Sequence, residues 1–176
     1  QLKRNFYASS SCGVCGKASI EAITAERMIV AHHFTVDGHD LCAWPEAMRH
    51  AQAVFEQTGS LHAAALFAHD NTLLGIHEDV GRHNAVDKIV GSFALKGEPI
   101  PEACGLMVSG RTSFEIVQKA LVAGIAFVAA VSAPSSLAVE LARAGGMTLV
   151  GFLRGKGFNV YAGGERIRGD VRIIEE

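Results

Sequence analysis

The fold is decided by residues 104–131, which read CGLMVSGRTSFEIVQKALVAGIAFVAAV. Cys104 to Ser109 and Ile125 to Val131 are short apolar runs of strand length. Between them, Thr112 to Ala123 repeats its apolar residues at helical spacing, and Glu115 follows Thr112 at the spacing of a capping box. A strand, a helix and a second strand in this order predict two parallel strands joined by a crossover helix.

The alternation continues toward the C-terminus. Ser135 to Ala144 is expected to be a helix and Met147 to Leu153 a strand, while Phe158 to Ile174 has room for one or two short final strands. Strands that alternate with helices favour a sheet with helices on both of its faces. The sequence therefore predicts an α/β protein of three layers, α/β/α, built on a mostly parallel sheet.

A hairpin is expected on the N-terminal side. Ala63 to His69 and Thr72 to Glu78 are short apolar runs separated by Asp70-Asn71, a pair typical of tight turns. Its antiparallel strands would make the sheet mixed. Helices are expected on either side of this hairpin, at Pro45 to Gln57 and at Arg82 to Phe93.

The composition restricts the class of protein. The chain has 176 residues, of which 49% are hydrophobic and 19% charged, so it suits one well-packed domain rather than a disordered segment. Its formal net charge is −2 and it contains no long basic run, which argues against a nucleic-acid-binding surface. No uninterrupted apolar stretch reaches membrane-spanning length. The first residue is Gln1 rather than Met, so we expect that an upstream portion is missing.

Four cysteines are present, and two of them form a C-x-x-C pair, Cys12 and Cys15. A thiol reacts as its thiolate, and this spacing tends to lower the pKa of one partner. Residues 1–20 are rich in Ser and Gly around this pair, so they are expected to form a mobile loop ahead of a domain at 21–176. The alternative is half of a zinc site, but zinc usually takes four ligands and Cys42 and Cys104 stand alone. Redox or sulfur chemistry is the favoured interpretation, and no structural zinc is expected.

The run from Gly75 to Lys88 reads GIHEDVGRHNAVDK and crowds polar side chains at a strand end and the helix that follows. Ligands bind outside the carboxyl ends of strands in open sheets, and a helix N-terminus attracts phosphate. The alternative is a solvated helix face, with His83/Asp87 and Asn84/Lys88 as pairs four residues apart. That alternative leaves His77, Glu78 and Asp79 unexplained.

Two further segments follow predicted strands. Ser109 to Ser113, SGRTS, is either a phosphate-binding turn or a plainly capped helix start. Phe152 to Phe158, FLRGKGF, alternates basic residues with glycines and is either an anion site or an exposed β-turn. Because parallel strands end at one edge of a sheet, the basic side chains beyond these strands should converge there. They are Arg82, Arg111, Arg154 and Lys156.

Taken together, these motifs resemble the formate dehydrogenase accessory sulfurtransferase family, FdhD/NarQ. The resemblance rests on Ser11 to Gly16 (SCGVCG), His77 to Lys88 (HEDVGRHNAVDK), Ser109 to Glu115 (SGRTSFE) and Gly151 to Arg154 (GFLR). It covers nearly the whole chain in the family's order, and the long HEDVGRHNAVDK string is its most specific part. The family's upstream segment is missing, so the chain resembles the C-terminal, catalytic part.

The resemblance implies a cytidine-deaminase-like fold and a cytoplasmic sulfurtransferase. Such proteins take persulfide sulfur from a cysteine desulfurase and pass it to the molybdenum or tungsten bis-guanine-dinucleotide cofactor of formate dehydrogenase. It implies that Cys12 bears the persulfide and that Cys15 is its partner. It also implies a cofactor-binding segment and further site walls, with GDP as a surrogate ligand. The segment is Phe152, Leu153, Arg154, Gly155, Lys156 and Gly157; the walls include His77, Asp79, Arg82, His83, Ser109 and Arg111.

Two other functions stay open from the residues alone. A zinc deaminase shares the implied fold, but it needs H-x-E followed later by P-C-x-x-C, and here the C-x-x-C comes first and lacks the proline. A non-catalytic chaperone would bind the cofactor and use the thiols for binding or for nothing. A homodimer is possible, and no sequence feature tests it.

Overall fold

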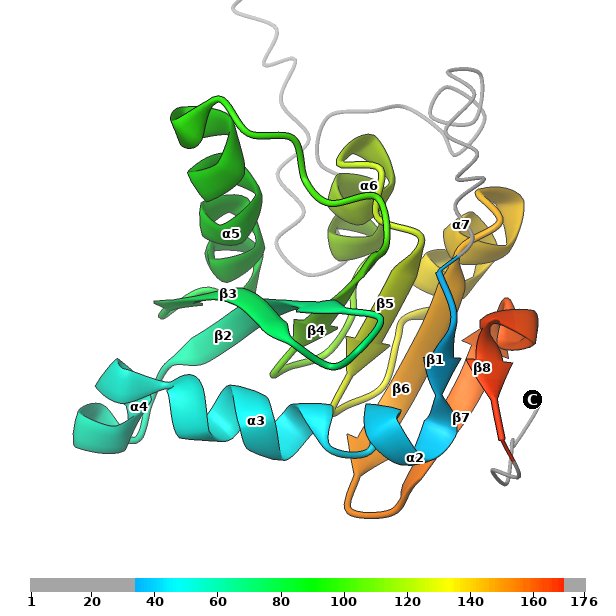
Figure 1. Ribbon diagram of the computed structural model, residues 1–176, viewed down its shortest axis with the longest axis horizontal. Coiled ribbons are helices and arrows are strands. Elements are labelled where there is room, and N and C mark those ends of the chain that lie inside the picture. The colour runs from blue at the N-terminus through cyan, green and yellow to red at the C-terminus, as the bar shows by residue number, and fades with distance from the viewer. Residues whose placement is uncertain (1–33, 170–176) are drawn as a thin grey trace, which may run out of the picture.

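The structure, a computed structural model, describes residues 34–169, which are built around a six-stranded sheet of order β3-β2-β4-β5-β6-β7 (Figure 1). A separate parallel pair, β1 and β8, lies beside it. The strands are β1 Val36–Asp37, β2 His62–Ala68, β3 Leu73–Asp79, β4 Cys104–Val108, β5 Phe127–Ala130, β6 Thr148–Arg154, β7 Gly157–Ala162 and β8 Ile167–Arg168. The helices are α2 Gly38–Leu41, α3 Trp44–Ala51, α4 Ala53–Thr58, α5 Arg82–Lys96, α6 Phe114–Val122 and α7 Ser136–Ala144.

The sheet is mixed, as expected. β4, β5 and β6 pair in parallel, β2 is antiparallel to both β3 and β4, and β7 is antiparallel to β6. It follows that β3, β4, β5 and β6 all run in one direction, while β2 and β7 run against them. The predicted hairpin is the β2–β3 pair, and its turn contains Asn71 at a positive φ of 67°. The expected short strands at the C-terminal end are β7 and β8.

Helices cover both faces of the sheet, so the predicted three-layer α/β/α architecture is confirmed (Figure 1). On one face, α5, α6 and α7 bury residues such as Val86, Val117 and Leu141 against Leu106 and Val128 of the sheet. The other face packs against α2, α3 and the β1–β8 pair. Within residues 34–169, no helix is long and apolar enough to cross a membrane.

Trp44 anchors the second face. Its side chain is fully buried and stacks on Phe67 at a ring-centroid distance of 4.7 Å. The indole N–H, which needs a partner when buried, donates to Asn71 Oδ1 at 2.8 Å in the β2–β3 turn. The ring lies directly on the backbone of Gly105, where a Cβ atom would come within 2.5 Å of it. Thus α3, the hairpin turn and β4 are all held by one side chain.

The helix expected over Pro45 to Gln57 is interrupted. Helix α3 ends at Ala51 and α4 begins at Ala53, because Gln52 takes φ −80° and ψ 81° and leaves the helical region. The first backbone N–H groups of α4, at Val54 and Phe55, donate to the two carboxylate oxygens of Glu78, each at 2.8 Å. A cap supplied by a residue far along the chain therefore starts a new helix within the expected one.

The capping box expected at Thr112 is wrong. The N-cap is one residue later, at Ser113, which makes no side-chain hydrogen bond to the helix, and α6 begins at Phe114. Thr112 is held through its backbone instead: its N–H donates to Ala133 O at 3.2 Å, and Ser135 N–H donates to Thr112 O at 2.9 Å. These bonds tie the turn before α6 to the turn before α7. By contrast, Ser135 caps α7, because its side chain accepts from Ala138 N–H.

Candidate functional site

The carboxyl ends of β3, β4, β5 and β6 lie along one edge of the sheet, and β2 begins at the same edge. At this edge, β3 ends with Asp79 and β6 ends with Arg154. Ser109 follows β4, Val131 follows β5, and His62 begins β2. His62 pairs with Asp79 in the ladder, and Ser109 Oγ accepts from Ala63 N–H at 2.8 Å. The predicted strand-end segments are therefore brought to a common edge.

Arg82 and His62 meet over the turn after β4. A Cβ atom on Gly110 would lie 3.3 Å from the His62 ring and 3.4 Å from Arg82 Cδ, so bare backbone lets both side chains approach. Ser109 Oγ lies 3.4 Å from His62 Nδ1. Among the described residues, the buried Nε of Arg82 has no hydrogen-bond partner. A guanidinium with an unused donor beside a turn that has no side chain at Gly110 is suited to an anionic ligand.

The end of β6 presents an aromatic ring and a cation together. Phe152 has a positive φ of 51°, a strained conformation for a bulky residue, and its side chain is exposed. The Arg154 guanidinium lies 5.8 Å from the Phe152 ring centroid, and Arg154 Nε donates to Val131 O at 2.7 Å. Leu153, between them, is buried in the core of the second face. The β-turn that follows exposes Gly155, Lys156 and Gly157.

The histidine and carboxylates at the end of β3 have structural partners. His77 pairs with Ala64 in the hairpin, and Glu78 caps α4. The next residue, Asp79, accepts from Gly81 N–H at 2.9 Å and from the Asn84 amide at 3.0 Å, and it forms an ion pair with Lys88. Two consecutive carboxylates thus fix two helices. That His77 and Asp79 also contact a ligand stays a prediction.

The pKa of the Asp79 carboxyl is lowered to about 2, chiefly because Lys88 binds its charged form, and further because the Gly81 N–H and the Asn84 amide donate to it. A carboxyl that titrates lower in the folded state than its unfolded value of about 3.9 stabilises the fold when ionised. This contribution is fully present above about pH 4. It is lost as the pH falls toward about 2, the folded-state pKa.

We therefore expect a Lys88→Met variant to lose less stability than the parent between pH 5 and pH 2, because its Asp79 titrates closer to the unfolded value. Urea unfolding at a series of pH values measures this difference in slope. An Asp79→Asn variant, which cannot titrate, should show the same flattening. Parallel pH profiles for the parent and both variants would contradict the assignment.

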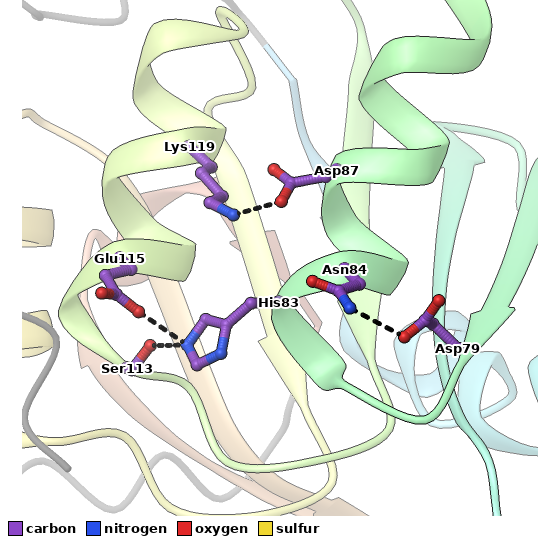
Figure 2. Close-up of polar contacts among 7 residues, drawn as sticks. All are labelled: Asp79, His83, Asn84, Asp87, Ser113, Glu115 and Lys119. Atoms are coloured by element: carbon purple, nitrogen blue, oxygen red, sulfur yellow. Dashed lines mark hydrogen bonds and ion pairs between the residues drawn. The ribbon is translucent and has the colours of Figure 1, made fainter. Parts of the chain in front are cut away.

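Helices α5 and α6 are joined by a ladder of polar side chains (Figure 2). His83 Nε2 lies 2.7 Å from Ser113 Oγ and 3.0 Å from Glu115 Oε2, and Lys119 Nζ lies 2.6 Å from Asp87 Oδ2. Asn84, Asp87 and Lys88 are exposed, as the solvated-face interpretation expected, but its His83/Asp87 and Asn84/Lys88 pairs are wrong. Each of the four side chains bonds to a partner on another element, or to Asp79 at the end of β3.

His83 stays uncharged more readily than an ordinary histidine. Burial lowers its pKa and the neighbouring Arg82 lowers it further, while Glu115 opposes both. The side chain points from α5 toward Ser113 and Glu115 at the start of α6 (Figure 2). Its part in the structure is to hold the two helix starts, and so the turns that carry Arg82 and Arg111, at a fixed spacing.

A cavity of about 460 Å³ opens between α3, α4 and this edge of the sheet. Its polar wall is formed by Arg49, Gln52, Ser60, His62 and Ser109, and its apolar wall includes Met48, Phe55, Leu61 and Val131. The volume is in the range of small-molecule sites. Arg49 and Gln52 carried no signal in the sequence, because Gln52 lies inside what reads as one continuous helix. His62 and Ser109 could be placed near a site from the strand pattern.

The described cysteines are poor nucleophiles. Burial raises the pKa of the Cys104 thiol to about 12, and it raises the pKa of Cys42 as well. Cys12 and Cys15 lie outside the described residues. Within the described range, no three His, Cys, Asp or Glu side chains gather as they would around a metal ion. The absence of zinc in the whole chain stays a prediction.

Comparisons with known proteins give consistent results. A model of the FdhD/NarQ family matches residues 1–168. The sulfur carrier protein FdhD of Mycobacterium tuberculosis is 55% identical over 169 residues, which cover 94% of this chain and 61% of that protein. The protein of the same name from Sulfolobus acidocaldarius is 48% identical over 165 residues, covering 93% and 63%. This chain therefore spans about three fifths of the length of these curated relatives.

A solved structure shares the fold. It is the crystal structure of a protein from Desulfotalea psychrophila described as a candidate formate dehydrogenase accessory protein. The match has a TM-score of 0.75 at 30% sequence identity and covers 85% of this chain and 63% of that one. The same arrangement of helices and strands thus occurs in a second, moderately similar sequence.

Proposed function

This chain belongs to the FdhD/NarQ family, and from that premise we propose that it is a sulfurtransferase that carries persulfide sulfur from a cysteine desulfurase to the molybdenum or tungsten bis-guanine-dinucleotide cofactor of formate dehydrogenase. The observation that carries the proposal is the C-x-x-C pair at Cys12 and Cys15 in a chain 55% identical to proteins named sulfur carriers. The C-x-x-C mechanism and the partners are part of the proposal.

The transfer needs one nucleophilic thiolate on this chain. The Cys12 thiolate attacks the outer sulfur of the desulfurase persulfide, the sulfur–sulfur bond of that persulfide breaks, and the desulfurase cysteine leaves as thiolate. The product is a persulfide on Cys12. Delivery as sulfide requires two electrons, which the Cys15 thiolate supplies by attacking the inner sulfur. That step forms a Cys12–Cys15 disulfide and releases the outer sulfur as sulfide to the acceptor.

The chemistry of the other cysteines supports this choice of nucleophile. Burial raises the pKa of both the Cys42 and the Cys104 thiol, so both side chains favour the unreactive thiol form. Cys104 is fully buried at the start of β4, where no donor protein can reach it. The C-x-x-C pair is left as the candidate carrier.

The edge of the sheet supports a nucleotide-bearing acceptor. Arg154 and Phe152 offer a cation and an exposed aromatic face, and Arg82 holds an unused buried donor beside the Gly110 turn. Guanidinium groups bind phosphate oxygens through charge-assisted hydrogen bonds, and aromatic faces stack on bases. We infer that the segment from Phe152 to Gly157 contacts the guanine dinucleotide part of the cofactor and that GDP is a usable surrogate.

The test is intact-mass spectrometry of the chain after incubation with a cysteine desulfurase and cysteine. We expect a population heavier by the mass of one sulfur atom, located on Cys12 by peptide analysis and removed by a reducing agent. A Cys42→Ala variant is the matched control and should gain the same mass. No added sulfur on the parent, or sulfur found on Cys42, would contradict the proposed function.

A further inference from the structure

The cavity beside α3 and α4 has the features of a base-binding pocket. We propose that it holds a flat, carbonyl-bearing heterocycle, with the Gln52 amide as the group that reads the carbonyl oxygen. This proposal rests on the nucleotide ligand of the proposed function and adds to it a location for the base and a rule for which bases are accepted. It depends on the position of the cavity, the chemistry of its wall and the unusual state of Gln52.

The cavity shares Val131 with the surroundings of Arg154 at the end of β6. Val131 lines the cavity, and its carbonyl oxygen accepts the hydrogen bond from Arg154 Nε. His62 lines it as well, and the His62 ring shares the Gly110 turn with Arg82. One ligand with a base in the cavity and phosphates at the sheet edge would therefore contact both regions.

The walls suit a planar ring. Met48, Phe55 and Leu61 supply apolar and aromatic surface, and the Phe55 ring is itself held by the Arg49 guanidinium 4.3 Å from its centroid. Met adapts to ring faces and aromatic side chains stack on them. An extended aliphatic chain would leave the polar wall of the cavity without partners, so a flat ring with polar edges fits better.

The polar wall offers hydrogen-bond donors, and none of its described residues is a carboxylate. Ser109 Oγ accepts from Ala63 N–H at 2.8 Å, so its hydroxyl hydrogen is directed either to His62 Nδ1, at 3.4 Å, or to a ligand. The Arg49 guanidinium adds further N–H donors, and no carboxylate lines this cavity among the described residues. Glu78 caps α4, and Glu56, which does not line the cavity, pairs with the Arg49 guanidinium at 3.0 Å. Such a wall favours ring oxygens over ring amino groups.

Among the described residues that line the cavity, Gln52 carries a buried donor without a hydrogen-bond partner. It lies at the break between α3 and α4, it is only 4% exposed, and its Nε2 is buried without a hydrogen-bond partner among the described residues. A buried donor without a hydrogen bond costs free energy, and native structures usually supply its acceptor. The last torsion of a glutamine side chain turns easily, so a carbonyl oxygen in the cavity can take this hydrogen bond. Ligand binding would then satisfy a donor that the chain leaves unused.

A specificity rule follows from the absence of a carboxylate. Guanine and hypoxanthine share the ring oxygen and differ only in the 2-amino group, which this wall has no acidic group to bind. GDP and IDP should therefore bind alike, within about threefold. ADP carries an amino group in place of the oxygen and should bind about 10- to 100-fold more weakly, the range expected for one hydrogen bond to a buried donor.

The experiment is calorimetric titration of the full chain with GDP, IDP, ADP and pyrophosphate. Gln52→Leu removes the donor, and Gln52→Glu keeps the shape while turning a carboxylate toward the ring oxygen. Gln57→Leu is the matched control, because Gln57 is an exposed α4 residue outside this cavity. Arg154→Ala tests the phosphate end. Thermal melting of each variant confirms that it is folded.

We expect both Gln52 variants to lose at least about tenfold in GDP affinity and to lose the preference of GDP over ADP, with pyrophosphate binding unchanged. Arg154→Ala should weaken GDP and pyrophosphate together. GDP binding by the parent that is unchanged in folded Gln52 variants, or a clear preference of the parent for GDP over IDP, would overturn this proposal alone. Absence of GDP binding by the parent would overturn the nucleotide part of the proposed function and this proposal with it, whereas the persulfide measurement would stand.

Discussion

A Cys12→Ala variant is expected to lower formate dehydrogenase activity in cells to the level of a strain that lacks this protein. The reason is chemical: alanine has no thiolate to accept the sulfur, and the described cysteines have raised pKa values that keep them as thiols. The measurement is formate oxidation in extracts of a deletion strain complemented with the parent or the variant, at matched protein levels.

Stability separates a carrier from a structural cysteine. If Cys12 only carries sulfur, Cys12→Ala should unfold within about 0.5 kcal/mol of the parent. Cys42→Ala, which removes a half-buried thiol at the end of α2, should retain full activity in cells. A Cys12→Ala protein that melts far below the parent, or that supports normal formate oxidation, would show that the residue is not the sulfur carrier.

A Trp44→Ala variant is expected to lose about 3–5 kcal/mol of unfolding free energy, the range for removing a large buried aromatic side chain. Trp44 is fully buried, stacks on Phe67 and donates to Asn71, so its removal opens a cavity and leaves the Asn71 acceptor at the hairpin turn without its donor. Urea unfolding followed by circular dichroism measures the loss, because the variant lacks the only tryptophan.

Two companion variants test the mechanism. Trp44→Phe keeps an aromatic ring and should recover much of the loss, though not the hydrogen bond to Asn71. Gly105→Ala places a methyl group against the indole and should destabilise the parent, but it should cost less in the Trp44→Ala background, where the space is empty. Strictly additive effects of the two substitutions would mean that the ring and the glycine backbone are not in contact.

The sequence could predict the fold where local pattern and tertiary structure agree. The segments around β4, β5 and β6 are short apolar runs and those around α6 and α7 repeat apolar residues at helical spacing, and each element formed within a few residues of its expected bounds. The helix over residues 45–57 could not be predicted correctly, because its break depends on Glu78, which is distant in the sequence. The capping box failed for a similar reason: Glu115 bonds to His83 on another helix.

The candidate site was predictable to the extent that strand direction determines it. Arg82, Ser109 and Arg154 follow strands that run the same way, so their meeting at one edge could be anticipated. The chemistry within that edge could not. Whether Arg82 has a partner, and whether a cavity opens beside Gln52, depends on the packing of α3 and α4 against the strand ends.

The two carboxylates that close β3 also have a consequence for how the hairpin finds its pairing. Glu78 and Asp79 are neighbours in a strand, so their side chains leave it on opposite sides, one to cap α4 and the other to hold α5. If β3 slipped by one residue against β2, each acid would face the wrong layer, so α4 would lose its cap and α5 its contacts with Asp79 at the same time. Mispaired forms of the hairpin are thus penalised twice, and the chain has a built-in check on its own alignment.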